Sequence, residues 1–143
     1  MNTPTILTLK LLRKNGYEAA VVERRNWFAG PPHMRCSACN KNRVGKTIDL
    51  FGWADIVAVW GGKAPAPITG TLYIQTTSRR NRWSRLHKII NDRIARKVIE
   101  SGNTIWLIHW HQPDGHGTRW VPEIEFIDRA ALGKHKRGKV QPA

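Results

Sequence analysis

The pattern of apolar and polar residues predicts a chain that mixes helices with strands. Apolar residues recur at helical spacing in residues 4–14, which follow a capping Thr3, and again in residues 83–100. Shorter runs rich in β-branched and aromatic residues predict strands. We expect these strands at residues 17–25, 53–60, 71–77, 104–111 and 120–127. This order of elements predicts an α/β fold class, in which a central mixed β-sheet is flanked by helices.

The second of these strands brings a carboxylate next to a run that is apolar at every position, residues 56–59. Such a run indicates a strand buried on both faces. A carboxylate beside it, Asp55, is costly unless a metal ion or hydrogen-bond donors stabilise it. Gln75, Thr76 and Thr77 end the next strand, so neighbouring strands could hold oxygen ligands a few ångströms apart, as a hard cation requires. The alternative is a strand-start carboxylate that accepts backbone N–H bonds, beside ordinary polar residues at a strand end.

Residues 26–46 show no helical or strand pattern, and we expect a long loop beside the binding site. The loop contains both cysteines of the chain, Cys36 and Cys39, which are too few for a disulfide framework. Zinc needs about four ligands, and His33 is the nearest further candidate, so two reduced thiols are the preferred interpretation and zinc is the alternative. Trp27 and Phe28 either pack in a small core or stack on an unpaired base.

Charge narrows the class of partner. The 143 residues include 24 Lys and Arg against 10 Asp and Glu, a net charge of +14, while a hydrophobic share of 41% argues against a disordered polycation. No apolar run is long enough to span a membrane, and no signal peptide pattern begins the chain, so we expect nucleic acid as the partner and the cytoplasm of a bacterial or phage-infected cell as the location. The predicted nucleic-acid-binding residues are Arg24, Arg25, Arg79, Arg80, Arg82, Arg85 and Lys88. The alternative interpretation of the cluster at residues 79–88 is a solvated helix face. The basic tail at residues 133–143 is predicted to be disordered, which leaves residues 1–132 as the domain.

The order of these elements resembles the PD-(D/E)XK nuclease superfamily, in particular its Holliday junction resolvase-like branch. The resemblance is carried by Trp-Ala-Asp-Ile-Val-Ala-Val at residues 53–59 and Leu-Tyr-Ile-Gln-Thr-Thr-Ser at residues 72–78, followed by a helix and the strand at residues 105–109. Residues 11–17 also resemble the family's opening. The likeness covers about residues 5–127 and implies a restriction-endonuclease-like core.

The resemblance implies a metal-dependent DNA endonuclease that cleaves branched or duplex DNA with Mg²⁺ or Mn²⁺ and works as a homodimer. It implies a catalytic set of Asp55, Gln75 and Thr77, in which Asp55, Gln75 and Asp49 hold the metal. Gln75 and Thr77 stand where the family has an acid and a lysine. The acid that the family places in its first helix is also missing, and Asp49 and Glu23 are the nearest substitutes.

Two alternatives to a nuclease stay open. Because the Gln-x-Thr pair departs from the family's motif, the same fold could serve as a non-catalytic DNA-binding module. A basic structural protein that binds RNA is the second alternative, although such a protein would not need Asp55 beside a buried strand.

Overall fold

The computed structural model describes residues 3–29 and 43–132 of the chain. Within these residues the elements are α1 (Pro4–Lys14), β1 (Tyr17–Val21), β2 (Arg24–Ala29), β3 (Arg43–Ile48), β4 (Ile56–Trp60), β5 (Leu72–Ser78), the 3₁₀ turn η1 (Arg79–Asn81), α2 (Arg82–Ile90), α3 (Arg93–Glu100), β6 (Thr104–His111) and β7 (Val121–Ile127).

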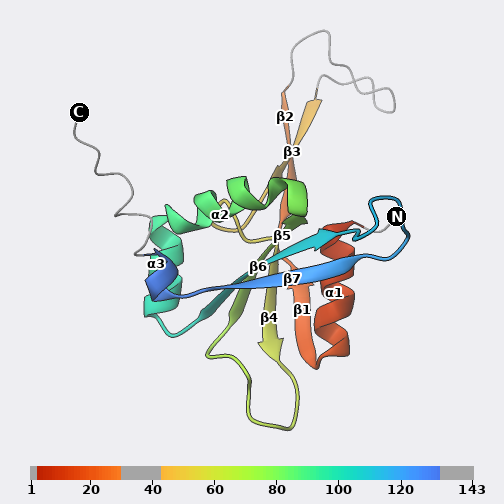
Figure 1. Ribbon diagram of the computed structural model, residues 1–143. Coiled ribbons are helices and arrows are strands. Elements are labelled where there is room, and N and C mark those ends of the chain that lie inside the picture. The colour runs from red at the N-terminus through yellow and green to blue at the C-terminus, as the bar shows by residue number, and fades with distance from the viewer. Residues whose placement is uncertain (1–2, 30–42, 133–143) are drawn as a thin grey trace, which may run out of the picture.

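Five strands form the central sheet in the order β1-β4-β5-β6-β7, with β5 and β6 parallel and all other neighbours antiparallel. The parallel pair is joined by η1, α2 and α3, while α1 covers the opposite face (Figure 1). β2 and β3 pair only with each other and extend away from the main sheet (Figure 1). The α/β fold class with a mixed, helix-flanked sheet is therefore confirmed.

The first helix begins and ends where its sequence predicts. The Thr3 side chain caps α1 by accepting a hydrogen bond from the Ile6 backbone N–H at 3.4 Å, and Pro4 occupies the first helical position. Asn15 ends the helix, and Gly16 adopts a φ of +92°, a conformation in which a side chain would be strained. This turn sends the chain directly into β1.

The predicted single helix over residues 83–100 is wrong, because the structure has two helices there. Asn91 ends α2, and the Asp92 carboxylate accepts hydrogen bonds from the backbone N–H groups of Ile94 and Ala95 at 2.5 and 3.1 Å. An N-cap residue has an extended backbone, so a helix cannot continue through it. The capping bonds of Asp92 therefore end one helix and begin the next. The apolar period continues across the break, which hides it from a reading of periodicity alone.

The strand predicted over residues 17–25 is also wrong at its end, because β1 stops at Val21 and the chain enters β2 at Arg24. Part of the predicted loop over residues 26–46 is the β2–β3 pair, in which Arg24 lies opposite Ile48. Hydrogen bonds between the two backbones stabilise this pair of strands. Its sequence has no alternating apolar pattern from which the strands could be predicted. The side chains of Arg25, Trp27 and Phe28 lie outside the described residues, as do His33, Cys36, Cys39 and the predicted tail at 133–143.

Apolar side chains fill both faces of the sheet. Between the sheet and α1 lie residues such as Leu12, Ile56 and Trp110, and between the sheet and α2 and α3 lie residues such as Trp53 and Ile89. Strand β6 alternates between the two cores, so that Trp106 and Trp110 face α1 while Ile105 and Leu107 face the other side. No helix in residues 3–29 or 43–132 has the length and apolar character needed to cross a bilayer.

Candidate metal centre

The register of the two central strands brings Asp55 and Gln75 together. Ile56 lies opposite Ile74 in the antiparallel β4–β5 pair, and the Asp55 backbone N–H donates to the Ile74 carbonyl oxygen at 2.9 Å. The Gln75 side-chain amide donates to Asp55 Oδ2, and the Thr76 backbone N–H donates to the same oxygen at 2.9 Å. The predicted neighbours are thus in contact on the face of the sheet that α2 covers, and Asp55 is only 6% exposed.

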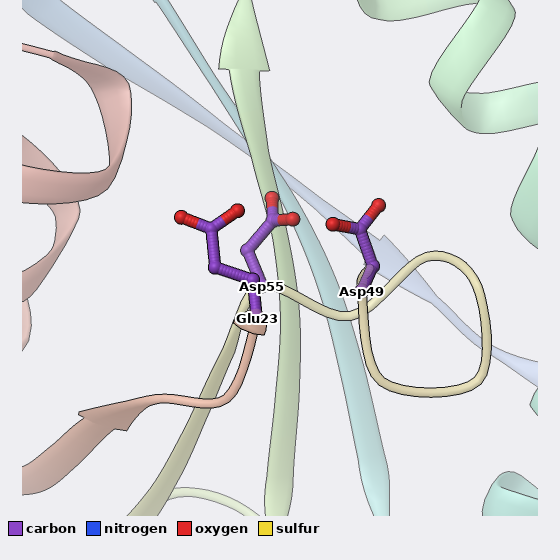
Figure 2. A group of neighbouring side chains, drawn as sticks. All are labelled: Glu23, Asp49 and Asp55. Carbon is purple, nitrogen blue, oxygen red and sulfur yellow. The ribbon is translucent and has the colours of Figure 1, made fainter. Parts of the chain in front are cut away.

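Two further carboxylates approach Asp55. Glu23 follows β1 and Asp49 follows β3, and one carboxylate oxygen from each of the three residues lies within 4.8 Å of the others. Figure 2 shows the three carboxyl groups side by side, with Asp55 in the middle. Sequence reasoning placed Asp49 and Asp55 in a metal site, but treated Glu23 only as a substitute for a missing helix acid.

Backbone pairing explains why these three residues meet. The Val22 N–H donates to the Asp55 carbonyl oxygen at 2.9 Å, which holds Glu23 beside the start of β4. Leu50 forms an antiparallel bridge with Ala54 across a tight turn. Because Asp49 precedes Leu50 and Asp55 follows Ala54, this bridge brings the two aspartates together. We call Glu23, Asp49 and Asp55 the acidic triad.

The surroundings of the acidic triad disfavour negative charge. Burial raises the pKa of Asp55 to about 7, and the neighbouring Asp49 and Glu23 carboxylates add to the rise, while the Thr76 N–H bond and Arg85 oppose it. Burial also raises the pKa of Glu23, with a further contribution from Asp49. Three carboxylates so placed are better accommodated when a cation is bound among them.

Gln75 adds an unsatisfied oxygen to this wall. Its side chain is 1% exposed, and among the described residues its Oε1 atom has no hydrogen-bond partner. Buried polar atoms are nearly always satisfied, so an orphaned amide oxygen beside three carboxylates needs a reason. Carboxylate and amide oxygens are the ligands that Mg²⁺, Mn²⁺ and Ca²⁺ take in proteins, and the donor set therefore fits a hard divalent cation.

The acidic triad opens into a groove of about 600 Å³ between the sheet and α2. Arg85 Nη1 and Lys88 Nζ, both on α2, each lie 3.9 Å from Asp49 Oδ2. Thr77, the third predicted catalytic residue, is 6% exposed and also lines the groove. We call this hollow the acidic groove; its lining residues are Pro4, Thr5, Glu23, Thr47, Asp49, Asp55, Gln75, Thr76, Thr77, Ser78, Asn81, Arg85 and Lys88.

Of the other predicted nucleic-acid-binding residues, Arg24, Arg79, Arg80 and Arg82 lie outside the acidic groove. Arg79 and Arg80 are exposed on η1, and Arg24 is exposed at the start of β2. Arg79 Nη1 lies 4.0 Å from Glu123 Oε1, whereas the Arg82 guanidinium makes a closer, two-point contact with the Glu125 carboxylate. Its charge is therefore already engaged within the protein.

No family model, curated protein or solved structure matches this chain. The likeness to the PD-(D/E)XK superfamily accordingly stays a prediction from its motifs and element order.

Proposed function

We propose that this protein is a metal-dependent endonuclease that cleaves DNA phosphodiester bonds in the acidic groove. The observation that carries the proposal is the meeting of opposite charges there. The acidic triad can hold a divalent cation, and Arg85 and Lys88 stand on the facing wall. Cleavage of a phosphodiester needs both: carboxylates to hold the metal ion, and positive charge to neutralise the phosphate while its phosphorus is attacked.

Each residue of the acidic groove has a task in this proposal. Glu23, Asp49 and Asp55 would hold Mg²⁺ or Mn²⁺, which when bound would polarise a phosphoryl oxygen and lower the pKa of a coordinated water. Gln75 and the Thr76 N–H fix the orientation of the Asp55 carboxylate. This fixed orientation reduces the cost of ordering the ligand when the ion arrives.

The acidic groove also contains positive charge that could replace the lysine missing from the family's motif. Where the resemblance implies a lysine, Thr77 carries no charge that could steady an attacking hydroxide. Lys88 and Arg85 bring positive charge into the same groove from α2 instead of from β5. We assign to these two side chains the binding of the phosphate's non-bridging oxygens.

The non-catalytic module remains a second candidate because of the hydrogen bonds to Asp55. Two donors already satisfy Asp55 Oδ2, so this carboxyl group has partners without a metal ion. In this case the basic surface would bind DNA without cutting it. A homodimer on branched DNA is implied only by the resemblance, and it belongs to the nuclease proposal.

The test incubates the purified protein with labelled four-way junction, duplex DNA, single-stranded DNA and RNA, in Mg²⁺, in Mn²⁺ and in chelator. We expect DNA cleavage that requires a metal ion, is lost in Asp55→Ala and is retained in Asp114→Ala, which removes an exposed carboxylate that does not line the acidic groove. Tight, salt-sensitive DNA binding without cleavage would refute the nuclease and support the module. Binding to RNA alone would favour the structural RNA-binding protein.

A further inference from the structure

A tryptophan on the basic helix is left largely in solvent. Trp83 lies in the first turn of α2 and is 60% exposed, whereas most large apolar side chains of the described residues are buried. Its indole is nevertheless held in place, because the Arg82 guanidinium carbon lies 4.4 Å from the ring centroid. Arg82 is itself fixed by Glu125, with Nη2 2.9 Å from Oε2. The ring is therefore a preorganised flat surface rather than a loose side chain.

The surroundings of Trp83 suit a polyanion. From Arg79 to Asn91 the chain has five Lys and Arg residues and no Asp or Glu. Phe126 is similarly exposed, at 68%, but its ring contacts Trp106, on the face of the sheet that α1 covers and away from these cations. Phe51 is 38% exposed, but its ring centroid lies 6.3 Å from that of Trp53 and 5.9 Å from that of Tyr73, in the turn after β3. Within residues 79–91, which carry these cations, Trp83 is thus the exposed Trp, Tyr or Phe side chain.

A continuous surface joins Trp83 to the acidic groove. A second hollow, of about 610 Å³, runs along the outer side of α2 and shares Asn81, Arg85 and Lys88 with the acidic groove. His87 also lines this outer hollow, and its ring centroid lies 6.4 Å from that of Trp83. At about 100° per residue, Trp83 and Arg85 lie on opposite flanks of a helix that is about 10–12 Å wide with its side chains. A strand that crosses α2 would therefore have its phosphates at Arg85 and Lys88 and a base near Trp83.

We propose that Trp83 stacks on an unpaired base of the DNA strand whose phosphate occupies the acidic groove. This inference rests on the proposed function and names its substrate class: DNA with unpaired nucleotides beside the cut, such as a fork, a flap or a single strand. A base inside an intact duplex has both faces stacked on its neighbours and offers no face to the indole. Stacking on aromatic side chains tolerates any base sequence, since every base has a π-face.

The test measures binding in chelator, so that no cleavage occurs, for Trp83→Ala, Trp83→Phe and Arg80→Ala on forked, single-stranded and fully paired DNA. We expect Trp83→Ala to weaken binding of forked and single-stranded DNA by roughly 5- to 150-fold and to leave duplex binding unchanged. Trp83→Phe should retain most of the affinity, because it retains an aromatic face. Arg80→Ala should instead weaken binding of all three DNAs and reduce the salt slope by about 0.7–0.9, whereas Trp83→Ala should leave that slope unchanged.

A direct readout uses 2-aminopurine, a fluorescent base that is quenched by stacking, at successive unpaired positions. We expect one or two positions to be quenched by the wild-type protein and by Trp83→Phe, but not by Trp83→Ala. Equal losses of duplex and single-strand binding in Trp83→Ala, no loss at all, or no quenched position would each overturn the inference. Failure of the nuclease proposal is a separate result, because it would appear as intact stacking in chelator without cleavage in Mg²⁺.

Discussion

Two groups of carboxylates lie on the side of the sheet that α2 covers, and they are neutralised very differently. On β7, Glu125 contacts Arg82 through both of its oxygens, and its Oε1 lies 3.1 Å from His109 Nε2. Its neighbour Glu123 lies 3.3 Å from His111 Nδ1. In the acidic triad, the ion pairs among the described residues are those of Asp49 Oδ2 with Arg85 Nη1 and Lys88 Nζ, both at 3.9 Å.

This difference separates a structural charge network from a binding site. In the β7 group one arginine stands beside each carboxylate, because Arg82 contacts Glu125 and Arg79 Nη1 lies 4.0 Å from Glu123 Oε1. In the acidic triad the carboxylates crowd one another, and Glu23 has no ion pair among the described residues. The same residue types therefore stabilise the fold in one place and leave room for a cation in the other.

The largest effect should come from removing ligands of the acidic triad. We expect the double variant Glu23→Gln with Asp49→Asn to bind Mn²⁺ more than roughly 100-fold more weakly, because loss of even an outer partner of a ligand costs about 10- to 100-fold. Calorimetric titration of Mn²⁺ measures this change. Glu123→Gln is the matched control and should bind Mn²⁺ as the wild type does. Equal losses in both variants would show that the two groups of carboxylates do not differ in this way.

The next effect concerns pH. The Asp55 pKa of about 7 lies above its unfolded value near 4, so the folded protein retains a proton that the unfolded chain releases. This carboxyl group therefore costs stability as pH rises from about 4 through 7. We expect Asp55→Asn to gain about 2–4 kcal/mol of unfolding free energy over the wild type between pH 4 and pH 8, without metal. Urea unfolding at several pH values measures the difference, and parallel curves for the two proteins would contradict it.

A smaller effect is expected from breaking the β7 group. Arg82→Ala leaves Glu125, whose side chain is 25% exposed, without its two-point partner. We expect a loss of about 1–3 kcal/mol in the free energy of unfolding, since hydrogen bonds to charged groups contribute in that range. Urea unfolding at pH 7 is the measurement. A loss under 0.5 kcal/mol, the size typical of surface substitutions, would mean that Glu125 is well solvated without Arg82.

The smallest effect on stability belongs to the cation wall of the acidic groove. Lys88 is 46% exposed and its Nζ lies 3.9 Å from Asp49, so Lys88→Ala should change the unfolding free energy by less than about 0.5 kcal/mol. The same variant should weaken DNA binding on forked and duplex DNA alike, because it removes a phosphate contact. Thermal unfolding beside a binding titration separates the two results. A strongly destabilised Lys88→Ala would assign this lysine to the fold instead of to the ligand.

The elements that could be predicted from sequence are those whose own residues carry the signal, as an apolar run or as residues that begin and end a helix. Strand β6 appears where its apolar run predicts it, and α1 appears between a capping Thr3 and a terminating Gly16. The break at Asp92 was missed because one side chain's local hydrogen bonds decide it while the apolar period continues unchanged. The β2–β3 ribbon was missed because it depends on pairing between segments that show no pattern of their own.

The candidate site divides in the same way. Asp55 and Gln75 could be placed together because they lie at the facing ends of strands that are adjacent in the chain. Glu23 could not, since it reaches Asp55 only through the hydrogen bond from Val22 and the excursion of β2 and β3 out of the sheet. A carboxylate that follows a strand by two residues is too common a feature to indicate a ligand by itself.

The floor of the acidic groove is also tied to the far side of the sheet. Thr76, whose N–H holds Asp55, has its hydroxyl 2.7 Å from the Thr8 hydroxyl on α1, which in turn accepts a hydrogen bond from Trp110 Nε1 at 2.9 Å. All three of these side chains are buried, so water cannot replace a lost member. The position of the Asp55 carboxylate therefore depends partly on residues behind the sheet. The substitution Thr8→Val, at a residue that does not line the acidic groove, would remove the hydroxyl that holds Thr76 and so loosen the backbone N–H that binds Asp55.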